Sequence, residues 1–217
     1  MIHKSILPAI GLASLMLIAP AYAASTTDQA VADIVKAQTK LHSLKSLTAD
    51  IDTVNTMGGK ASKASGTVKC LKPNYLWIET RGTAGHQWHI SNGQQYCAND
   101  PKGHWTSVKA DPHGANFRDD LLLWSDFYVL FATGNAQRVV GGADVTIEDK
   151  SVNAHSYEVI TAVHKAPHPM TMTVYIGHWD GLIHRMIVDG GPMHMAVTWS
   201  NIKPNAPLKP RAFQPRY

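Results

Sequence analysis

The chain has 217 residues, with 20 Lys or Arg, 16 Asp or Glu, and a formal net charge of +4. Its 44% hydrophobic and 17% charged residues exclude an intrinsically disordered chain and a solvated helical array, so one globular domain is expected. The longest apolar stretch, residues 6–20, is about 15 residues long, shorter than the roughly 20 that a membrane-spanning helix needs. No integral membrane protein is therefore indicated.

The N-terminal residues have the three parts of an export signal. Lys4 supplies the positive start, residues 6–18 the apolar middle, and Ala21-Tyr22-Ala23 the small-x-small cleavage site. We therefore predict a signal peptide at residues 1–23, a single domain at residues 24–217, and a periplasmic location. Removing Lys4 leaves 19 basic and 16 acidic residues. Because the Lys and Arg residues are scattered along the sequence, no nucleic-acid partner is predicted.

The first predicted element after the signal is a helix. Ser25 to Asp28 offer side-chain oxygens for an N-cap, and an apolar face follows at helical spacing. That predicted face consists of Val31, Ile34, Val35, Gln38, Leu41 and His42.

From Leu47 onward the hydrophobic period changes to two, and turn pairs such as Asn92-Gly93 and Asp180-Gly181 separate short runs. Strands are predicted near 48–57, 64–72, 75–82, 86–91, 94–99, 104–109, 144–149, 155–164, 170–177, 182–189 and 193–200. About eleven antiparallel strands in one domain must curl or close. The fold class is thus α+β, mainly antiparallel β.

The segment 116–133 interrupts the strand pattern and predicts a second, unusually apolar helix. It contains Leu122, Leu123 and Phe127 and no Gly or Pro. A helix that is apolar on most sides must be covered by protein or by a ligand.

The two cysteines, Cys70 and Cys97, form an even pair in a compartment where disulfides are usual. In a plain meander, however, they lie three strand spacings apart, roughly 14 Å, whereas a bridge needs Cα atoms within about 7 Å. Both the bridged and the unbridged states remain open, and a bridge would require a strongly curled sheet.

Strand alternation divides the predicted sheet into two faces. Leu76 and Ile78 form an inward face opposite charged neighbours, and the same alternation selects Trp88 and Ile90 on the next strand. In the last meander the apolar face consists of Val174, Ile176, Met186, Val188, Val197 and Trp199. From the residues alone, this face is equally an ordinary core and the lining of a ligand-binding hollow.

Several short motifs resemble the periplasmic lipoprotein-carrier superfamily (LolA/LolB-like). These motifs are Gly66-Thr67-Val68 before Lys72-Pro73-Asn74-Tyr75-Leu76-Trp77, Ile90-Ser91-Asn92-Gly93 before Asp100-Pro101, Asp180-Gly181-Leu182-Ile183, and Phe213-Gln214-Pro215. The order of signal, helix, strands, helical insert, strands and extended tail is similar over most of the chain. The chain thus resembles a divergent member.

The resemblance implies a curled, half-open barrel of about eleven strands whose helices cover the concave face. It also implies an acyl chain, lipoprotein or other hydrophobic ligand in an apolar hollow, with a transient membrane-protein partner and a monomeric, non-enzymatic carrier. The implied hollow is lined by Leu76, Ile78, Trp88, Ile90, Leu122, Leu123, Phe127, Val174, Ile176, Met186, Val197 and Trp199. The resemblance places Lys72 where the carriers have an arginine that contacts the helical lid. Lysine lacks the planar guanidinium group with which arginine can hold several carbonyl oxygens at once.

A competing interpretation comes from the sulfur and imidazole side chains. Thioethers and imidazoles are suitable Cu(I) ligands, and they gather before and within two predicted strands as His164, His168, Met170, Met172, Met193, His194 and Met195. Methionine also serves as flexible filling of an apolar face, so no metal or cofactor is predicted. No common hydrolase, metalloprotease or nucleotide-binding motif occurs after residue 23, and no catalytic residue is predicted.

Overall fold

The computed structural model describes residues 25–72, 75–83, 85–99, 102–109, 136–165 and 169–214. The predicted signal peptide at 1–23 lies outside the described residues. So does the predicted helix at 116–133, with Leu122, Leu123 and Phe127.

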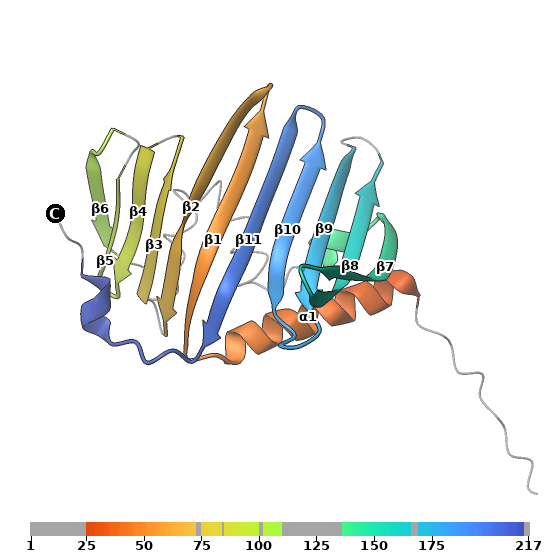
Figure 1. The fold of residues 1–217 in the computed structure, drawn as a ribbon, viewed down its shortest axis with the longest axis horizontal. Coiled ribbons are helices and arrows are strands. Elements are labelled where there is room, and N and C mark those ends of the chain that lie inside the picture. Colours follow the sequence, from red (N-terminus) through yellow and green to blue (C-terminus); the bar gives the residue numbers. More distant parts are fainter. Residues whose placement is uncertain are drawn as a thin grey trace, which may run out of the picture.

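The described chain forms one antiparallel sheet of eleven strands in the order β6-β5-β4-β3-β2-β1-β11-β10-β9-β8-β7, as Figure 1 shows. The strands are β1 (Ser46–Met57), β2 (Lys60–Leu71), β3 (Tyr75–Gly82), β4 (Gly85–Asn92), β5 (Gln95–Asn99), β6 (Trp105–Lys109), β7 (Asp144–Val152), β8 (His155–His164), β9 (Met170–Gly177), β10 (Ile183–Gly190) and β11 (Met193–Pro204). All eleven predicted strands are confirmed.

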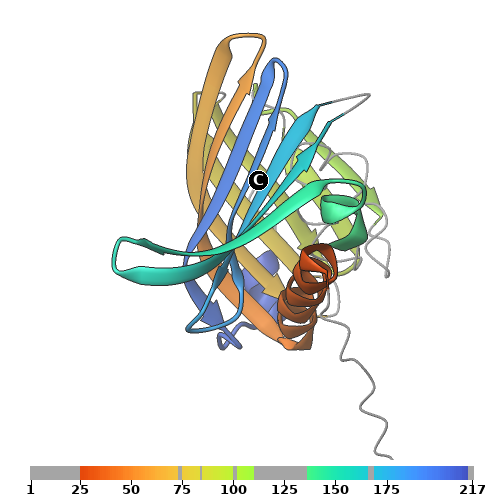
Figure 2. The same cartoon turned by 90° about the vertical axis from the view of Figure 1, so that its right-hand side faces the viewer.

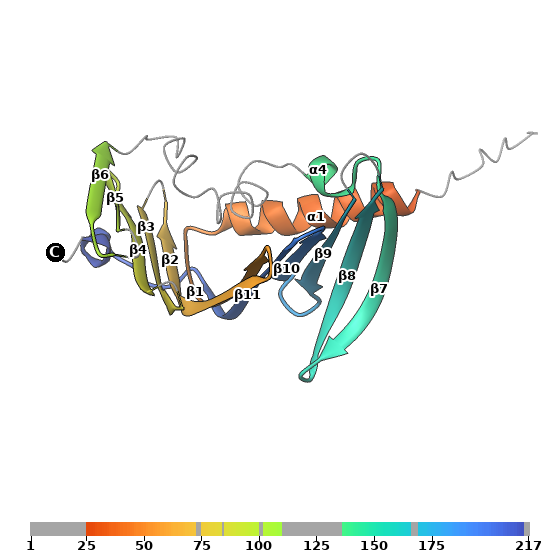
Figure 3. The same ribbon diagram turned by 90° about the horizontal axis from the view of Figure 1, so that it is seen from above.

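The sheet consists of two meanders joined by β1 and β11, which pair along most of their lengths, for example at Ile51 and Trp199. The sheet curls into a trough whose two edge strands do not meet, and α1 runs along its open side (Figure 3). The predicted half-open, mainly antiparallel fold is therefore confirmed.

Helix α1 (Thr26–Ser43) begins as the sequence predicts. The Ser25 side chain accepts a hydrogen bond from the Asp28 backbone N–H at 3.1 Å and so caps the first turn. The predicted inward face is partly wrong, because Val35 is 41% exposed. Instead, Ala30 and Ala37 are buried beside Ile34, and these small residues let the helix approach the sheet closely.

A second described helix, α4 (Ala136–Val140), was not predicted. It has five residues, too few for a helical period to show in the sequence. Its Val139 and Val140 are completely buried in the concave core, and the helix contacts both α1 and β8. Tertiary packing therefore supports this helix.

Each face of the sheet has its own apolar cluster. The larger one fills the concave face below α1 and α4. The smaller one lies on the convex face, where the short helix η1 (Pro210–Phe213) places Phe213 against Trp77 and Ile90. The C-terminal segment thus covers the outer face.

Viewed from the side, the β7–β8 hairpin extends beyond the rest of the sheet (Figure 2).

Glycine is required where β2 and β3 approach each other closely. A Cβ added to Gly66 would lie 1.7 Å from the backbone oxygen of Glu79. This glycine belongs to the Gly-x-hydrophobic motif noted in the sequence, and its role in the fold is close strand contact.

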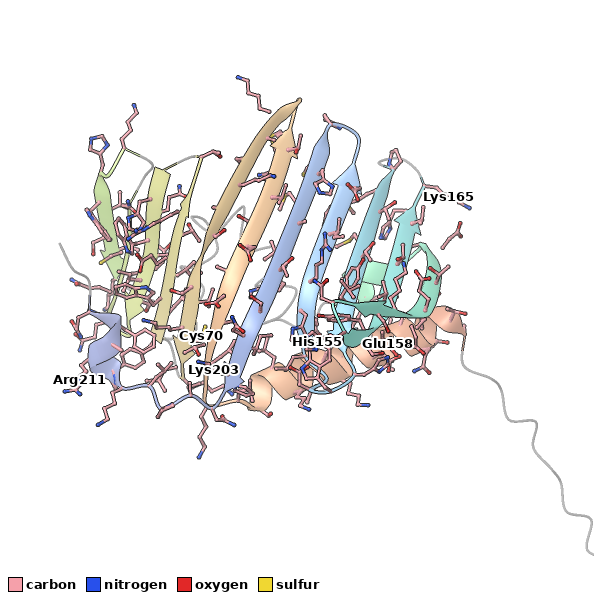
Figure 4. The ribbon with its side chains drawn as sticks, in the orientation of Figure 1. Cys70, His155, Glu158, Lys165, Lys203 and Arg211 are labelled. Carbon is pink, nitrogen blue, oxygen red and sulfur yellow. The ribbon has the colours of Figure 1, made fainter. Side chains whose placement is uncertain are left out.

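The fold also gathers basic residues that are scattered in the sequence. On the convex face, Lys69 of β2 and Lys203 of β11 both pair with Thr48 of β1. Nearby, the Lys72 backbone N–H donates to the Lys45 oxygen at 3.0 Å. Lys203 and Arg211 lie at this end of the sheet in Figure 4. Basic residues that are far apart in the sequence therefore lie at the same end of the sheet.

Candidate ligand-binding face

The concave face brings together seven of the predicted site residues. Directly opposed residues of antiparallel strands point to the same face, and the pairing continues across the sheet from Ile78 through Val68 to Ala49. The larger core cluster accordingly includes, in whole or at its border, Leu76, Ile78, Val174, Ile176, Met186, Val197 and Trp199. Leu76 is 4% exposed and Val174 1%, whereas Trp199 is half-buried.

Trp88 and Ile90 do not belong to this face, and that part of the prediction is wrong. Ile90 pairs with Trp77 and Trp88 pairs with Glu79, which places both on the convex face. There they contact the cluster that contains Phe213. Alternation within β4 correctly showed that Trp88 and Ile90 share a face, but the β3–β4 register decides which face it is.

The two cysteines are not joined by a disulfide. Cys70 pairs with Leu76 on the concave side, whereas Cys97 pairs with Ile90 on the convex side. Two strands also separate them in the sheet order. Burial raises the pKa of the Cys70 thiol to about 12, so this thiol stays protonated and unreactive at neutral pH.

Lys72 is exposed at the end of β2. The lid that the family resemblance assigns to it, residues 116–133, lies outside the described residues. The predicted contact between Lys72 and a lid therefore remains a prediction.

Six methionines follow the predicted signal peptide, and all six lie on the concave face of β1, β9, β10 and β11. The register places them there as Met57, Met170, Met172, Met186, Met193 and Met195. Sequence reasoning paired these residues within strands but did not show that all of them share one surface. Flexible, polarizable thioethers are common at surfaces that adapt to different apolar ligands.

A pocket of about 430 Å³ lies at one end of the sheet, and five of its lining residues form one row on the convex face: Thr56, Val163, Thr171, Asp189 and His194. It lies between the turn that joins β8 to β9 and the turn that joins β10 to β11, and its walls include His164, Met170, Met193 and His194. Four of the seven candidate copper ligands are among its lining residues, but His194 lies on the face opposite His164, Met170 and Met193. Met172 and Met195 lie one row further into the sheet, on either side of Val188, and His168 lies outside the described residues.

The other end of the concave face carries an acidic corner beside α1. Glu158 of β8 pairs with Asp149 of β7. Burial raises the pKa of Glu158, and the nearby carboxylate of Asp33 raises it further. His178, which bonds Asp149 at 2.8 Å, acts in the opposite direction. Glu158 is directly opposed to Ile176 of the concave core, so this acidic corner borders the apolar cluster.

Similarity to known proteins is found in the structure and not in the sequence. No protein-family profile matches the sequence, and no curated protein is significantly similar to it. Among solved structures, MucB has a TM-score of 0.51 and 12% identity, with coverage of 89% of this chain and 64% of MucB. LprF from Mycobacterium bovis has a TM-score of 0.49 and 14% identity, with coverage of 83% of this chain and 95% of LprF.

A LolA superfamily protein from Nitrosomonas europaea, NE2245, is a further similar structure. It has a TM-score of 0.38 and 10% identity, with coverage of 86% of this chain and 97% of that protein. At these identities the likeness concerns the fold, and MucB shows it at the highest TM-score of the three. The chain therefore has a fold similar to that of MucB.

Among the described residues, no helix is both long enough and apolar enough to cross a membrane.

Proposed function

We propose that this chain is an exported, periplasmic, non-enzymatic carrier that shelters an acyl chain, of a lipid or of a lipoprotein, against its concave face. The observation that carries the proposal is the apolar cluster of that face, which includes or borders five methionines: Met170, Met172, Met186, Met193 and Met195. Similarity in fold to LprF and to a LolA superfamily protein accompanies this surface but does not identify a ligand.

The energetics of acyl-chain binding suit such a surface. Each methylene removed from water contributes about 0.8 kcal/mol. A sixteen-carbon chain thus contributes on the order of 10 kcal/mol before the cost of ordering. The pocket of about 430 Å³ at the end of the face falls within the range of small-molecule sites. Met170 and Met193, which are among its lining residues, border the concave core.

Delivery of such a ligand requires exchange with a second component. The acyl chain must leave the sheltered face without passing through water. A transient membrane-protein partner would fulfil this requirement, and the carrier itself would be a monomer.

Native mass spectrometry of protein purified from the periplasm without detergent tests the ligand directly. Organic extraction and metal analysis of the same sample identify what is bound. We expect an added mass that extraction converts into a fatty acyl species, on a polypeptide that lacks residues 1–23. A bare polypeptide that also fails to take up a fluorescent fatty acid would overturn the proposal.

Two adjacent residues of β11 provide a matched test of the binding face. Trp199 and Thr198 are both half-buried but point to opposite faces. We expect Trp199→Glu to reduce fatty-acid binding at least tenfold, because it places a charge on the apolar surface. Thr198→Glu should leave binding unchanged. Leu76→Glu should have the same effect as Trp199→Glu, and circular dichroism confirms that each variant is folded.

Equal affinity of the Trp199→Glu and Thr198→Glu proteins for the fatty acid would contradict the assignment of the concave face.

A further inference from the structure

We propose that one end of the sheet, here called the basic end, docks on a membrane surface through the phosphate groups of anionic phospholipids. The basic end consists of six cationic residues from segments far apart in the sequence: Lys45, Lys69, Lys72, Lys203, Lys209 and Arg211. All of them except Lys69 are exposed. The choice of a membrane as the partner rests on the proposed carrier function, whereas the charge of the surface does not.

The strand register places two of these lysines in one row of the convex face. Thr48 of β1 is directly opposed to Lys203 of β11 on one side and to Lys69 of β2 on the other. Two strand spacings separate the lysines, so their Cα atoms lie about 10 Å apart. Beyond Lys69 the row continues to Trp77 of β3, and the Lys69 Nζ lies 5.5 Å from the centroid of the indole ring.

Hydrogen bonds of the backbone bring the remaining cations to the same end. The Lys72 N–H donates to the Lys45 carbonyl oxygen at 3.0 Å, and the Lys45 N–H donates to the Asn205 side-chain oxygen at 2.9 Å. Asn205 lies two residues after Lys203, so the tail continues from this point. It then forms η1, which carries Lys209 and Arg211 and places Phe213 in the same apolar cluster as Trp77.

The positive charge of the basic end is not neutralised within the described part of the chain. The ion pairs between described residues include none of five of the cations, namely Lys45, Lys69, Lys203, Lys209 and Arg211. The next row of the convex face contains two carboxylates, Asp50 and Glu79. Asp50 accepts a hydrogen bond from the Asn201 side chain at 2.6 Å, and Glu79 lies 2.9 Å from the His86 Nε2 and 3.4 Å from an Arg81 nitrogen. Both carboxylates are therefore engaged by other residues.

A layer of phospholipid headgroups fits this surface by charge and by extent. The cations are spread over the end of the sheet and do not surround one enclosed site, and each Lys or Arg near an anionic membrane surface strengthens binding roughly fivefold. Cys70 and Leu76, which border or belong to the concave core, are directly opposed at the same end of the strands. Docking here would bring this end of the apolar face next to the bilayer, where an acyl chain must enter or leave.

Co-sedimentation of the purified protein with lipid vesicles tests the docking surface. We expect binding to vesicles of phosphatidylcholine that contain phosphatidylglycerol, and none to vesicles of phosphatidylcholine alone. Raising NaCl from about 0.1 M to about 1 M should release the protein, since the Debye length falls from about 10 Å to about 3 Å.

Two triple variants with the same net charge separate the basic end from the charge of the whole protein. Lys45→Gln, Lys203→Gln and Arg211→Gln together should weaken binding to the phosphatidylglycerol vesicles about 100-fold, at roughly fivefold for each cation. The control substitutes three exposed lysines of α1 and of the β1–β2 turn end of β2, with Lys36→Gln, Lys60→Gln and Lys63→Gln. It should stay within about threefold of the unchanged protein, because charges beyond a Debye length from the membrane are screened.

The proposal is overturned if the two triple variants lose affinity equally, or if the protein binds phosphatidylcholine vesicles equally well. Tighter binding to soluble polyglutamate than to the phosphatidylglycerol vesicles would instead assign the surface to an acidic protein partner.

Binding of the fluorescent fatty acid without vesicles keeps this test separate from the proposed function. The Lys45→Gln, Lys203→Gln, Arg211→Gln protein should bind the fatty acid as the unchanged protein does, because the substitutions leave the concave core intact. Vesicle binding without fatty-acid binding would contradict carriage alone, and fatty-acid binding without vesicle binding would contradict docking alone.

Discussion

The surroundings of the Cys70 side chain determine the pKa of its thiol. It sits at the border of the concave core and pairs with the buried Leu76. Burial against this core disfavours a thiolate, and the pKa of the thiol is raised from 9.0 to about 12 for that reason. Cys70 is thus not a disulfide partner of Cys97, which lies on the opposite face.

The raised pKa of Cys70 predicts a loss of stability at alkaline pH. In the unfolded chain the thiol ionises near pH 9.0, but in the folded protein it ionises only near pH 12. Stability should therefore be unaffected by this group below pH 9 and should decrease between pH 9 and pH 12, by at most about 1.4 kcal/mol per pH unit. Urea unfolding of the Cys70→Ala protein isolates the effect, since the variant should lack this part of the pH dependence.

A thiol titration provides the matching test of the disulfide. We expect two reactive thiols per chain after denaturation without reductant. Thiols that react only after a reductant is added would contradict the unbridged structure.

At the scale of elements, the C-terminal helix η1 stabilises the outer face of the sheet. Phe213 is 0% exposed, and its ring centroid lies 5.5 Å from that of Tyr75. Together with Trp77 and Ile90 it forms an apolar cluster on a face that would otherwise meet solvent. The terminal Phe-x-Pro motif noted in the sequence thus acts as an anchor for the tail.

We predict that Phe213→Ala destabilises the protein by about 3–5 kcal/mol, because it removes a fully buried aromatic ring. Urea unfolding followed by tryptophan fluorescence measures the change. Gln214→Ala, at the neighbouring exposed position, should change stability by less than about 0.5 kcal/mol. Similar unfolding midpoints for the two variants would show that the tail does not contribute to the core.

For the whole molecule, the open sheet has two edge strands, β6 and β7. Edge strands favour pairing with other chains unless charges or short length prevent it. β7 carries the exposed residues Glu148 and Lys150, which form an ion pair at 2.5 Å. These charges support the prediction of a monomer.

We therefore expect a monomer for the unchanged protein and self-association for the Glu148→Val, Lys150→Val variant. Size-exclusion chromatography with light scattering measures the mass. Thr161→Val with Thr173→Val makes comparable changes on the same face of the interior strands β8 and β9 and should stay monomeric. A monomeric edge variant at high concentration would show that these charges do not protect the edge.

The sequence by itself determined the local elements of this protein. The period-two patterns and turn residues predict all eleven strands, and the Ser25 cap marks the start of α1, because these signals lie within a few residues of one another. Alternation also groups residues correctly within a strand, as it does for Trp88 and Ile90.

Only the tertiary structure decided how those local elements combine. It placed Trp88 and Ile90 outside, buried the small residues of α1 in place of Val35, formed α4, and covered the convex face with η1. It also placed Met170 and Met193 in one row of the sheet, on either side of Gly190. The physical reason is that pairing register and packing depend on residues far apart in the chain, whereas hydrophobic periods describe one segment at a time.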